Sequence, residues 1–170
     1  MLILTAVSAA FSALMFITPY LSPAGSFIEL DGTPGVMDHW DLWSGKDLIT
    51  VLMYSFGDIF CHQQMSRTVI LNGSEMPVCI RDLGLLIGFL IGCAVTSVRF
   101  GSPAIYRNAR MYVIVTFILI FADWSIQHIF DLNIPFTRLV TGLLAGAGFA
   151  LIIYCWVISI FFGKDDGSAA

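Results

Sequence analysis

The sequence predicts an all-α integral membrane protein, a four-helix bundle with a short extracytoplasmic β-hairpin and an interfacial helix. Three observations predict this class. The 170 residues include only eight basic and twelve acidic side chains, or 12%, which is about half the charged share of soluble domains. Hydrophobic residues make up 58% of the chain, and its mean hydropathy is +0.86. The charges are absent from the long stretches 1–28, 83–98, 111–122 and 139–163.

This composition excludes two classes of protein. So few charged side chains could not keep the surface of an ordinary soluble enzyme hydrated. A nucleic-acid-binding protein needs a basic face, whereas this chain has a formal net charge of −4. The expected partner is therefore a lipid bilayer and not a nucleic acid. The length suits one domain, so residues 1–170 are predicted to form a single membrane domain.

Four segments are apolar over about the 20 residues that a spanning helix requires, and helices satisfy their own backbone hydrogen bonds in lipid. The predicted spans lie near 2–21, 81–99, 111–131 and 137–162. The first has no preceding Lys or Arg and is too long for a signal peptide, so we expect a retained anchor. The apolar run 48–60 has only 13 residues, which favours an interfacial or re-entrant segment over a fifth span.

The positions of the arginines predict the orientation of the bundle. Short loops rich in Lys and Arg stay in the cytoplasm. The segment 99–110 has no acidic residue and carries Arg99, Arg107 and Arg110. Segment 22–80 is then extracytoplasmic, and both termini, including the tail with Lys164, are cytoplasmic. We therefore expect a multi-pass protein of the cell membrane.

Glycines recur at every fourth position in two of the predicted spans. They are Gly84, Gly88 and Gly92 in the second span, and Gly142 and Gly146 in the fourth. Small residues at this spacing let helix backbones approach closely in lipid. Tight packing within the bundle is the favoured interpretation, and a homodimer through Gly84, Gly88 and Gly92 is the alternative.

A predicted hairpin would bring several reactive side chains together. The run RTVILNGSEMPV carries Asn72-Gly73, which suits a type I′ turn between two strands. Because a hairpin joins its own ends, the residues that flank it should meet at the outer face. These residues are Cys61, His62, Cys79 and Asp82.

The third predicted helix adds polar residues within the membrane. Asp123 and Gln127 are four residues apart and share one helix face. Asp123 lies about 20 Å along the helix from Arg110, in a core about 30 Å thick, and so near the outer side. An ionisable residue within a membrane is a candidate functional residue. The alternative is a structural ion pair between Asp123 and Arg138, which begins the fourth helix.

Three kinds of chemistry are open to the four flanking residues. Thiolate, imidazole and carboxylate are all zinc ligands, so the group predicts a metal site, although adjacent Cys61 and His62 cannot easily bind the same ion. A disulfide between Cys61 and Cys79 would persist outside the cytoplasm. A redox-active thiol pair with an acceptor such as a quinone is the third possibility, but the usual Cys-x-x-Cys spacing is missing.

A set of these residues resembles the signature of a known family. The elements in the first half are Cys61-His62-Gln63, Arg67, Gly73, Pro77-Val78-Cys79-Ile80-Arg81, Gly84 and Gly88; those in the second half are Asp123, Gln127, Asn133, Arg138, Thr141 and Gly142. The set resembles an uncharacterised family of small membrane proteins in bacteria and archaea, over roughly residues 48–150. That family's pattern ends its first half in Cys-x-Arg-Cys, where this chain has Asp82. Because Asp82 replaces the last cysteine of the pattern, a disulfide to that position is impossible in this chain. A metal site remains possible, since a carboxylate also binds zinc. The resemblance implies no reaction.

The sequence therefore predicts a zinc-like site made of Cys61, His62, Cys79 and Asp82, in a membrane hydrolase or transferase that acts on a lipid or small molecule. The metal would activate water, with Asp123 or His62 as the general base. Arg81 or Arg138 would hold an anionic group such as a lipid phosphate. Gln127 and Arg67 would contribute to cofactor binding.

Two alternatives to this function stay open. One is a thiol–disulfide or quinone-linked redox protein. The other is a non-enzymatic structural or assembly subunit with a Cys61–Cys79 disulfide.

Overall fold

The structure, a computed structural model, describes residues 1–33 and 35–162. The predicted tail with Lys164 lies outside these residues. The elements are α1 Leu2–Ile17, η1 Thr18–Tyr20, α2 Trp40–Trp43, α3 Leu48–Phe60, η2 Met65–Arg67, β1 Thr68–Leu71, β2 Ser74–Cys79, α4 Ile80–Val98, α5 Pro103–Ile129 and α6 Pro135–Phe162. The all-α class with a small antiparallel sheet is confirmed.

Four helical segments of the described chain are long and apolar enough to cross a membrane, as predicted. They are Leu2–Tyr20, Ile80–Val98, Pro103–Ile129 and Pro135–Phe161. The third begins eight residues before the predicted start at 111, because Pro103 suits the first helical position and follows Ser102 as N-cap. The predicted 99–110 loop is therefore only a short turn, and Arg107 and Arg110 lie in the first turns of α5.

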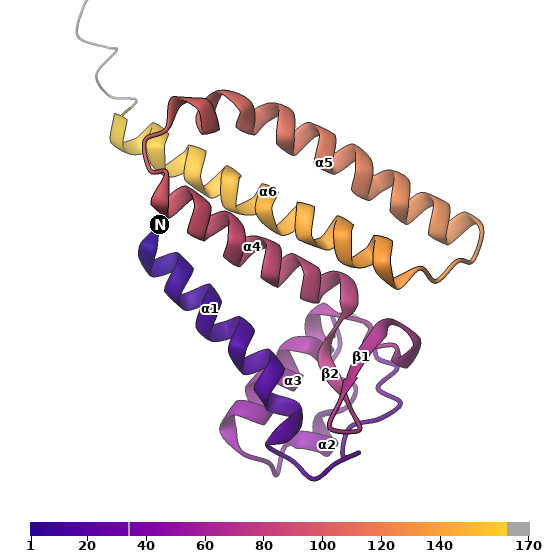
Figure 1. Cartoon of the computed structure of the whole chain (residues 1–170). Helices are drawn as coiled ribbons and strands as arrows, with labels where there is room; N and C mark the ends of the chain where they lie inside the picture. Colours follow the sequence, from indigo (N-terminus) through magenta and orange to yellow (C-terminus); the bar gives the residue numbers. More distant parts are fainter. Residues whose placement is uncertain (34, 163–170) are drawn as a thin grey trace, which may run out of the picture.

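The long helices place the two ends of the described chain together. Figure 1 shows α4, α5 and α6 side by side, with α1 beside α4. The N-terminus, the α4–α5 turn and the end of α6 lie at one end of the bundle (Figure 1). There the hydroxyls of Thr5 and Ser97 are 3.0 Å apart. The hairpin, α2 and α3 gather at the opposite end (Figure 1).

The glycines of α4 and α6 pack against each other. A Cβ atom added to Gly88 would lie 2.0 Å from the carbonyl oxygen of Leu143, and one added to Gly146 would lie 2.0 Å from that of Leu85. Gly84, Gly88 and Gly92 are all buried. The favoured interpretation, packing within the bundle, therefore describes these glycines. A homodimer through the same glycines would need a helix face that α6 already covers.

The predicted hairpin is present, with the predicted turn. Leu71 pairs with Ser74 across a two-residue loop. Asn72 has φ 51° and Gly73 has φ 68°, and two successive positive values are the mark of a type I′ turn. The Asn72 amide also donates to the carbonyl of Pro19 at 3.0 Å. This contact fastens the hairpin tip to the end of the first membrane helix.

Helix α3 packs directly on β2. A Cβ atom at Gly57 would lie 1.7 Å from the carbonyl oxygen of Pro77, so only glycine fits there. Asp47 is the N-cap of this helix, because its carboxylate accepts the Thr50 amide at 3.0 Å. The predicted short segment 48–60 is therefore a helix, and it delivers Cys61 beside the end of β2.

The glycine contacts give a test of the bundle. Gly146→Ala should destabilise the fold by about 1–3 kcal/mol, because the new methyl group collides with α4 backbone. Gly148→Ala is the matched control, since its Cβ would make an ordinary 3.8 Å contact with Tyr112. Thermal unfolding of the detergent-purified variants measures both effects. Equal melting temperatures for the two variants would contradict this packing.

A buried carboxyl group in β2 predicts a dependence of stability on pH. Glu75 is fully buried, and its Oε2 atom has no hydrogen-bond partner in the described chain. Burial raises the pKa of Glu75, whereas the unfolded chain ionises this group at lower pH. The fold should therefore lose stability as pH rises above the unfolded pKa.

Glu75→Gln removes this ionisation and keeps an acceptor for the Leu30 amide. At pH 8 we expect its melting temperature to exceed that of the wild type by about 2–4 °C. The gap should close below about pH 4, where both states hold the proton. The exposed Asp41, which is not among the charges that act on Glu75, provides the control Asp41→Asn, and it should show no such gap. A Glu75→Gln variant that melts below the wild type at pH 8 would show the account to be wrong.

Candidate functional site

Three of the four flanking residues meet as predicted. The sulfur atoms of Cys61 and Cys79 and a carboxylate oxygen of Asp82 all lie within 4.8 Å of one another. The Cys79 thiol donates to Asp82 Oδ2 at 3.0 Å, and the Cys79 amide donates to the Cys61 sulfur at 3.2 Å. Both cysteines are free thiols in the structure. We call Cys61, Cys79 and Asp82 the ligand trio.

Local structure explains why the trio converges. Cys79 ends β2 and is the N-cap of α4, so Asp82 follows in the first turn on the same side. Cys61 is the extended residue after α3, and the packing of Gly57 on β2 brings it alongside. The fully buried Gln63 donates its amide to the Pro77 carbonyl at 2.8 Å and holds the two segments together.

The two thiols have opposite acidities. The closeness of the two sulfur atoms raises the pKa of Cys61 and lowers the pKa of Cys79. Cys61 therefore holds its proton more tightly than Cys79 does. Burial and the neighbouring carboxylate of Asp82 further disfavour a second thiolate at Cys61. Both sulfurs could be ionised together only beside a compensating positive charge.

His62 does not join the trio. Cys61 has extended backbone angles, φ −132° and ψ 150°, and successive side chains along an extended chain point to opposite sides. His62 is exposed and lines the neighbouring cavity. The structure therefore separates this residue from the other expected metal ligands and places it on the cavity wall.

The trio borders a cavity of about 700 Å³. Its wall is made by the end of α3, η2, the first turn of α4, the end of α5 and the start of α6. The lining residues are Phe60, Cys61, His62, Gln64, Arg67, Cys79, Arg81, Asp82, Trp124, Gln127, His128, Asp131 and Arg138. Asp123 alone of the predicted site residues is missing from this wall.

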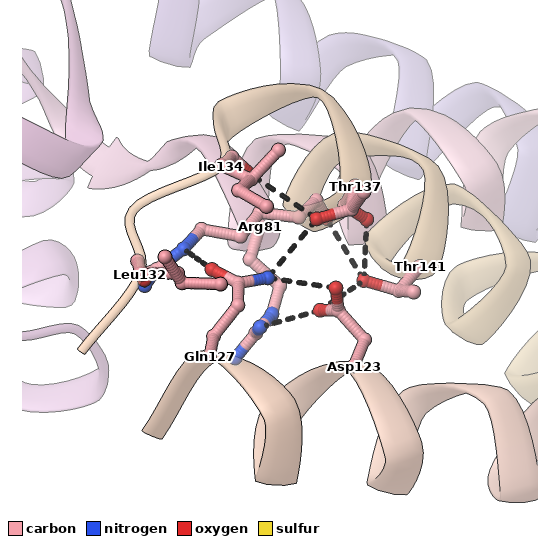
Figure 2. A network of polar contacts seen from close by, with 8 residues as sticks. Arg81, Asp123, Gln127, Leu132, Ile134, Thr137 and Thr141 are labelled. Atoms are coloured by element: carbon pink, nitrogen blue, oxygen red, sulfur yellow. Dashed lines mark hydrogen bonds and ion pairs between the residues drawn. The ribbon is translucent and has the colours of Figure 1, made fainter. Parts of the chain in front are cut away.

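Asp123 lies behind the cavity wall in a polar network that joins three helices (Figure 2). Its Oδ2 atom accepts Arg81 Nη2 at 2.9 Å, and its Oδ1 atom accepts Gln127 Nε2 at 2.7 Å. The Thr141 hydroxyl donates to Oδ2 at 3.3 Å. Because both oxygens already accept hydrogen bonds, Asp123 suits the positioning of Arg81 better than the removal of a proton from water.

The ion pair between Asp123 and Arg138, which was the alternative interpretation of Asp123, does not form. Asp123 pairs with Arg81 instead, and Arg138 donates its Nε–H to Gln127 Oε1. Gln127 therefore stands between the carboxylate and the second arginine, with its amide nitrogen on Asp123. A glutamine can do this because its side chain both donates and accepts. Arg81 comes from the first turn of α4, which the glycine contacts bring close to α6.

Several residues of the site were given no role by the sequence analysis. Thr137 accepts Gln127 Nε2 at 3.0 Å (Figure 2); its spacing of four from Thr141 on one helix face was an available signal. Trp124 and His128 line the cavity and stack with ring centroids 5.3 Å apart. Asn133 donates to the Ser66 carbonyl at 2.7 Å and ties the α5–α6 loop to η2. No sequence pattern marks that last contact.

Comparison with known families finds a match over the region that carries the cavity. The model of a family described as "Predicted membrane protein (DUF2085)" matches residues 61–152. The chain belongs to this family. The matched region of the DUF2085 chain starts at Cys61 and includes every cavity-lining residue except Phe60. It also includes Asp123 and Thr141 of the polar network.

One archaeal relative of this DUF2085 chain is similar over most of its length. The uncharacterized protein MJ1492 of Methanocaldococcus jannaschii is 28% identical over 116 residues, which cover 67% of this chain and 71% of the relative. No solved structure matches the chain.

The polar network gives a test of the role of Asp123. Asp123→Asn should destabilise the protein by at least about 2 kcal/mol, because it leaves the Arg81 guanidinium without its counter-ion. Asp131→Asn is the matched control, since Asp131 lines the same cavity, is exposed and forms no ion pair in the described chain. Thermal unfolding in detergent compares them. A fully stable Asp123→Asn variant would reject a positioning role.

Proposed function

We propose that the ligand trio binds a zinc-like divalent metal and that this centre catalyses hydrolysis of, or group transfer from, a membrane lipid. One observation carries the proposal. Three metal-ligating atoms of Cys61, Cys79 and Asp82 lie within 4.8 Å of one another at the wall of a cavity of about 700 Å³. Thiolate and carboxylate are ordinary zinc ligands.

The number of ligands favours a reactive centre over a purely structural one. Structural zinc sites use four protein ligands, whereas catalytic sites use three and leave a position for water or substrate. The trio supplies three, and the cavity supplies space for the fourth ligand. Zinc lowers the pKa of bound water to near neutrality. His62, which is exposed on the same wall, is our candidate for the general base.

The surroundings of the cavity support a lipid substrate. The cavity lies between helices that are long and apolar enough to span a membrane. Two large apolar side chains on its wall, Phe60 and Trp124, are 68% and 49% exposed, so a lipid chain could lie against them. The arginines near the α4–α5 turn stand at the other end of the bundle, which supports an outer-face site in the cell membrane.

A dithiol is the second candidate, and the closeness of the two free sulfurs favours it. Cys61 and Cys79 could form a disulfide, either as the redox centre of a quinone-linked protein or as a structural bond. A disulfide would remove both thiolates from the trio. The two candidates therefore exclude each other and can be separated by experiment.

Metal analysis of gently purified protein tests the first candidate. We expect about one equivalent of bound metal, and strong thiolate-to-cobalt absorption after cobalt replaces it. Cys79→Ser and Asp82→Asn should lose the metal, and Asp82→Cys should keep it because thiolate also binds zinc. Cys155→Ser, a thiol far along α6, is the matched control and should behave as the wild type.

Two results would overturn the proposal. The first is less than about a tenth of an equivalent of metal in folded protein. The second is resistance of Cys61 and Cys79 to thiol labelling until reductant is added, which would instead establish the disulfide. With metal bound, mass spectrometry of the lipids in protein-containing nanodiscs should detect a product that chelator and Cys79→Ser both abolish. A metal-loaded protein that leaves every lipid unchanged would refute the catalytic part.

A further inference from the structure

Three arginines from three separate elements surround the cavity beside the ligand trio. Arg67 comes from η2, Arg81 from the first turn of α4, and Arg138 from the first turn of α6. The hairpin and the helix bundle thus contribute guanidinium groups to one wall. Clustering of like charges costs free energy unless counter-charges are present.

The protein itself supplies only part of that counter-charge. Within residues 1–33 and 35–162, Arg81 pairs with Asp123, and neither Arg67 nor Arg138 has a carboxylate at ion-pair distance. The carboxylate of Asp82 accepts the Cys79 thiol and belongs to the ligand trio. Asp131 also lines the cavity but forms no ion pair with these arginines in the described chain. Two of the three guanidinium groups are therefore without an ion-pair partner at the cavity.

The hydrogen bonds of these arginines are also incomplete. The Nε atom of Arg81 is buried and has no partner in the described chain, although buried donors are nearly always paired. Arg138 is only 7% exposed, and its Nε–H is held by Gln127. Arg81 and Arg138 are thus fixed in place by Asp123 and Gln127, and they retain donor capacity.

The helices add to the positive potential. Both α4 and α6 begin at this cavity, with Cys79 as the N-cap of α4 and Arg138 in the first turn of α6. The N-terminus of a helix carries a partial positive charge and unpaired N–H groups. The two guanidinium groups without ion pairs, the unpaired Arg81 donor and the two helix N-termini all favour an anion at this cavity.

We propose that Arg67, Arg81 and Arg138 form a subsite for a phosphate-type dianion, meaning a phosphomonoester or inorganic phosphate. Two guanidinium groups without an ion-pair partner match a dianion better than a carboxylate or a phosphodiester, which carries one charge. The planar, forked guanidinium suits the oxygens of a phosphate group. This inference deepens the proposed function, on which it rests for the placement of the anion beside the metal.

Binding of two probes tests the subsite in the full chain, reconstituted in phosphatidylcholine nanodiscs. The probes are inorganic phosphate in solution and phosphatidic acid in the disc, both followed by ³¹P NMR. Competition between the two probes would support the shared chemistry. Binding of phosphatidic acid alone would assign the subsite to a lipid headgroup, and binding of phosphate alone would assign it to a soluble ligand. Phosphatidylglycerol, a monoanionic phosphodiester, should bind at least about tenfold more weakly.

Arg67→Gln is the main variant, because Arg67 is only partly buried and has no ion-pair partner to lose in the described chain. It should weaken probe binding at least about tenfold, as loss of a charge-assisted contact predicts. Arg138→Gln should do the same if it folds. Arg107→Gln, at the far end of α5, is the matched control and should bind as the wild type does.

Three outcomes would overturn the subsite. They are no binding of either probe by folded protein, equal binding of phosphatidylglycerol, and wild-type binding by folded Arg67→Gln. Each titration is run on chelator-treated and on metal-loaded protein, so the two proposals can fail separately. Phosphate bound without any metal affinity would refute the proposed function alone. Metal bound without phosphate affinity would refute the subsite alone.

Discussion

The close contact between α4 and α6 is the constraint on which the rest of the structure depends. Because Gly84, Gly88, Gly142 and Gly146 have no side chains, the two backbones come within contact distance of each other over residues 81–89 of α4 and 139–146 of α6. A Cβ atom at Gly142 would lie 2.1 Å from the Arg81 carbonyl oxygen. The contact therefore extends to the cavity and fixes the positions of the first turns of α4 and α6 relative to each other. In lipid the hydrophobic effect does not drive helices together, so dispersion forces between closely packed helices stabilise this contact.

A second close contact, between α3 and β2, aligns the outer segment with the bundle. The α3 helix can approach β2 because Gly57 has no side chain, and α4 continues directly from β2 through Cys79. The position of Cys61 relative to Asp82 is therefore set by two backbone contacts and one covalent connection. A site built in this way needs no long flexible side chains to bring its sulfur and oxygen atoms together.

Local patterns explain what the sequence could predict. Absence of charge marked the four spans, Asn72-Gly73 marked the turn, and closure of the hairpin placed the two thiols and Asp82 together. Each of these inferences needs only neighbouring residues and the geometry of one element. The exclusion of His62 depended on the extended backbone of Cys61, and the start of α5 at Pro103 depended on a helix that extends beyond its apolar part. Asp123 forms its ion pair with Arg81 and not with Arg138 because α4 packs closely against α6. No local sequence pattern encodes that contact.

The charges of the cavity fit together when the trio and the arginines are considered as one unit. Two thiolates and one carboxylate around a divalent zinc ion would carry one net negative charge, so the proposed centre would not by itself attract an anion. The arginines lie on the same wall, and Asp123 neutralises only Arg81. An anionic substrate would therefore be held by Arg67 and Arg138 and presented to the metal from the arginine side. In that case the polar network of Asp123 and Gln127 would keep Arg81 and Arg138 in place for the anion. Such a role would account for a carboxylate that lies within the membrane helices but does not line the cavity.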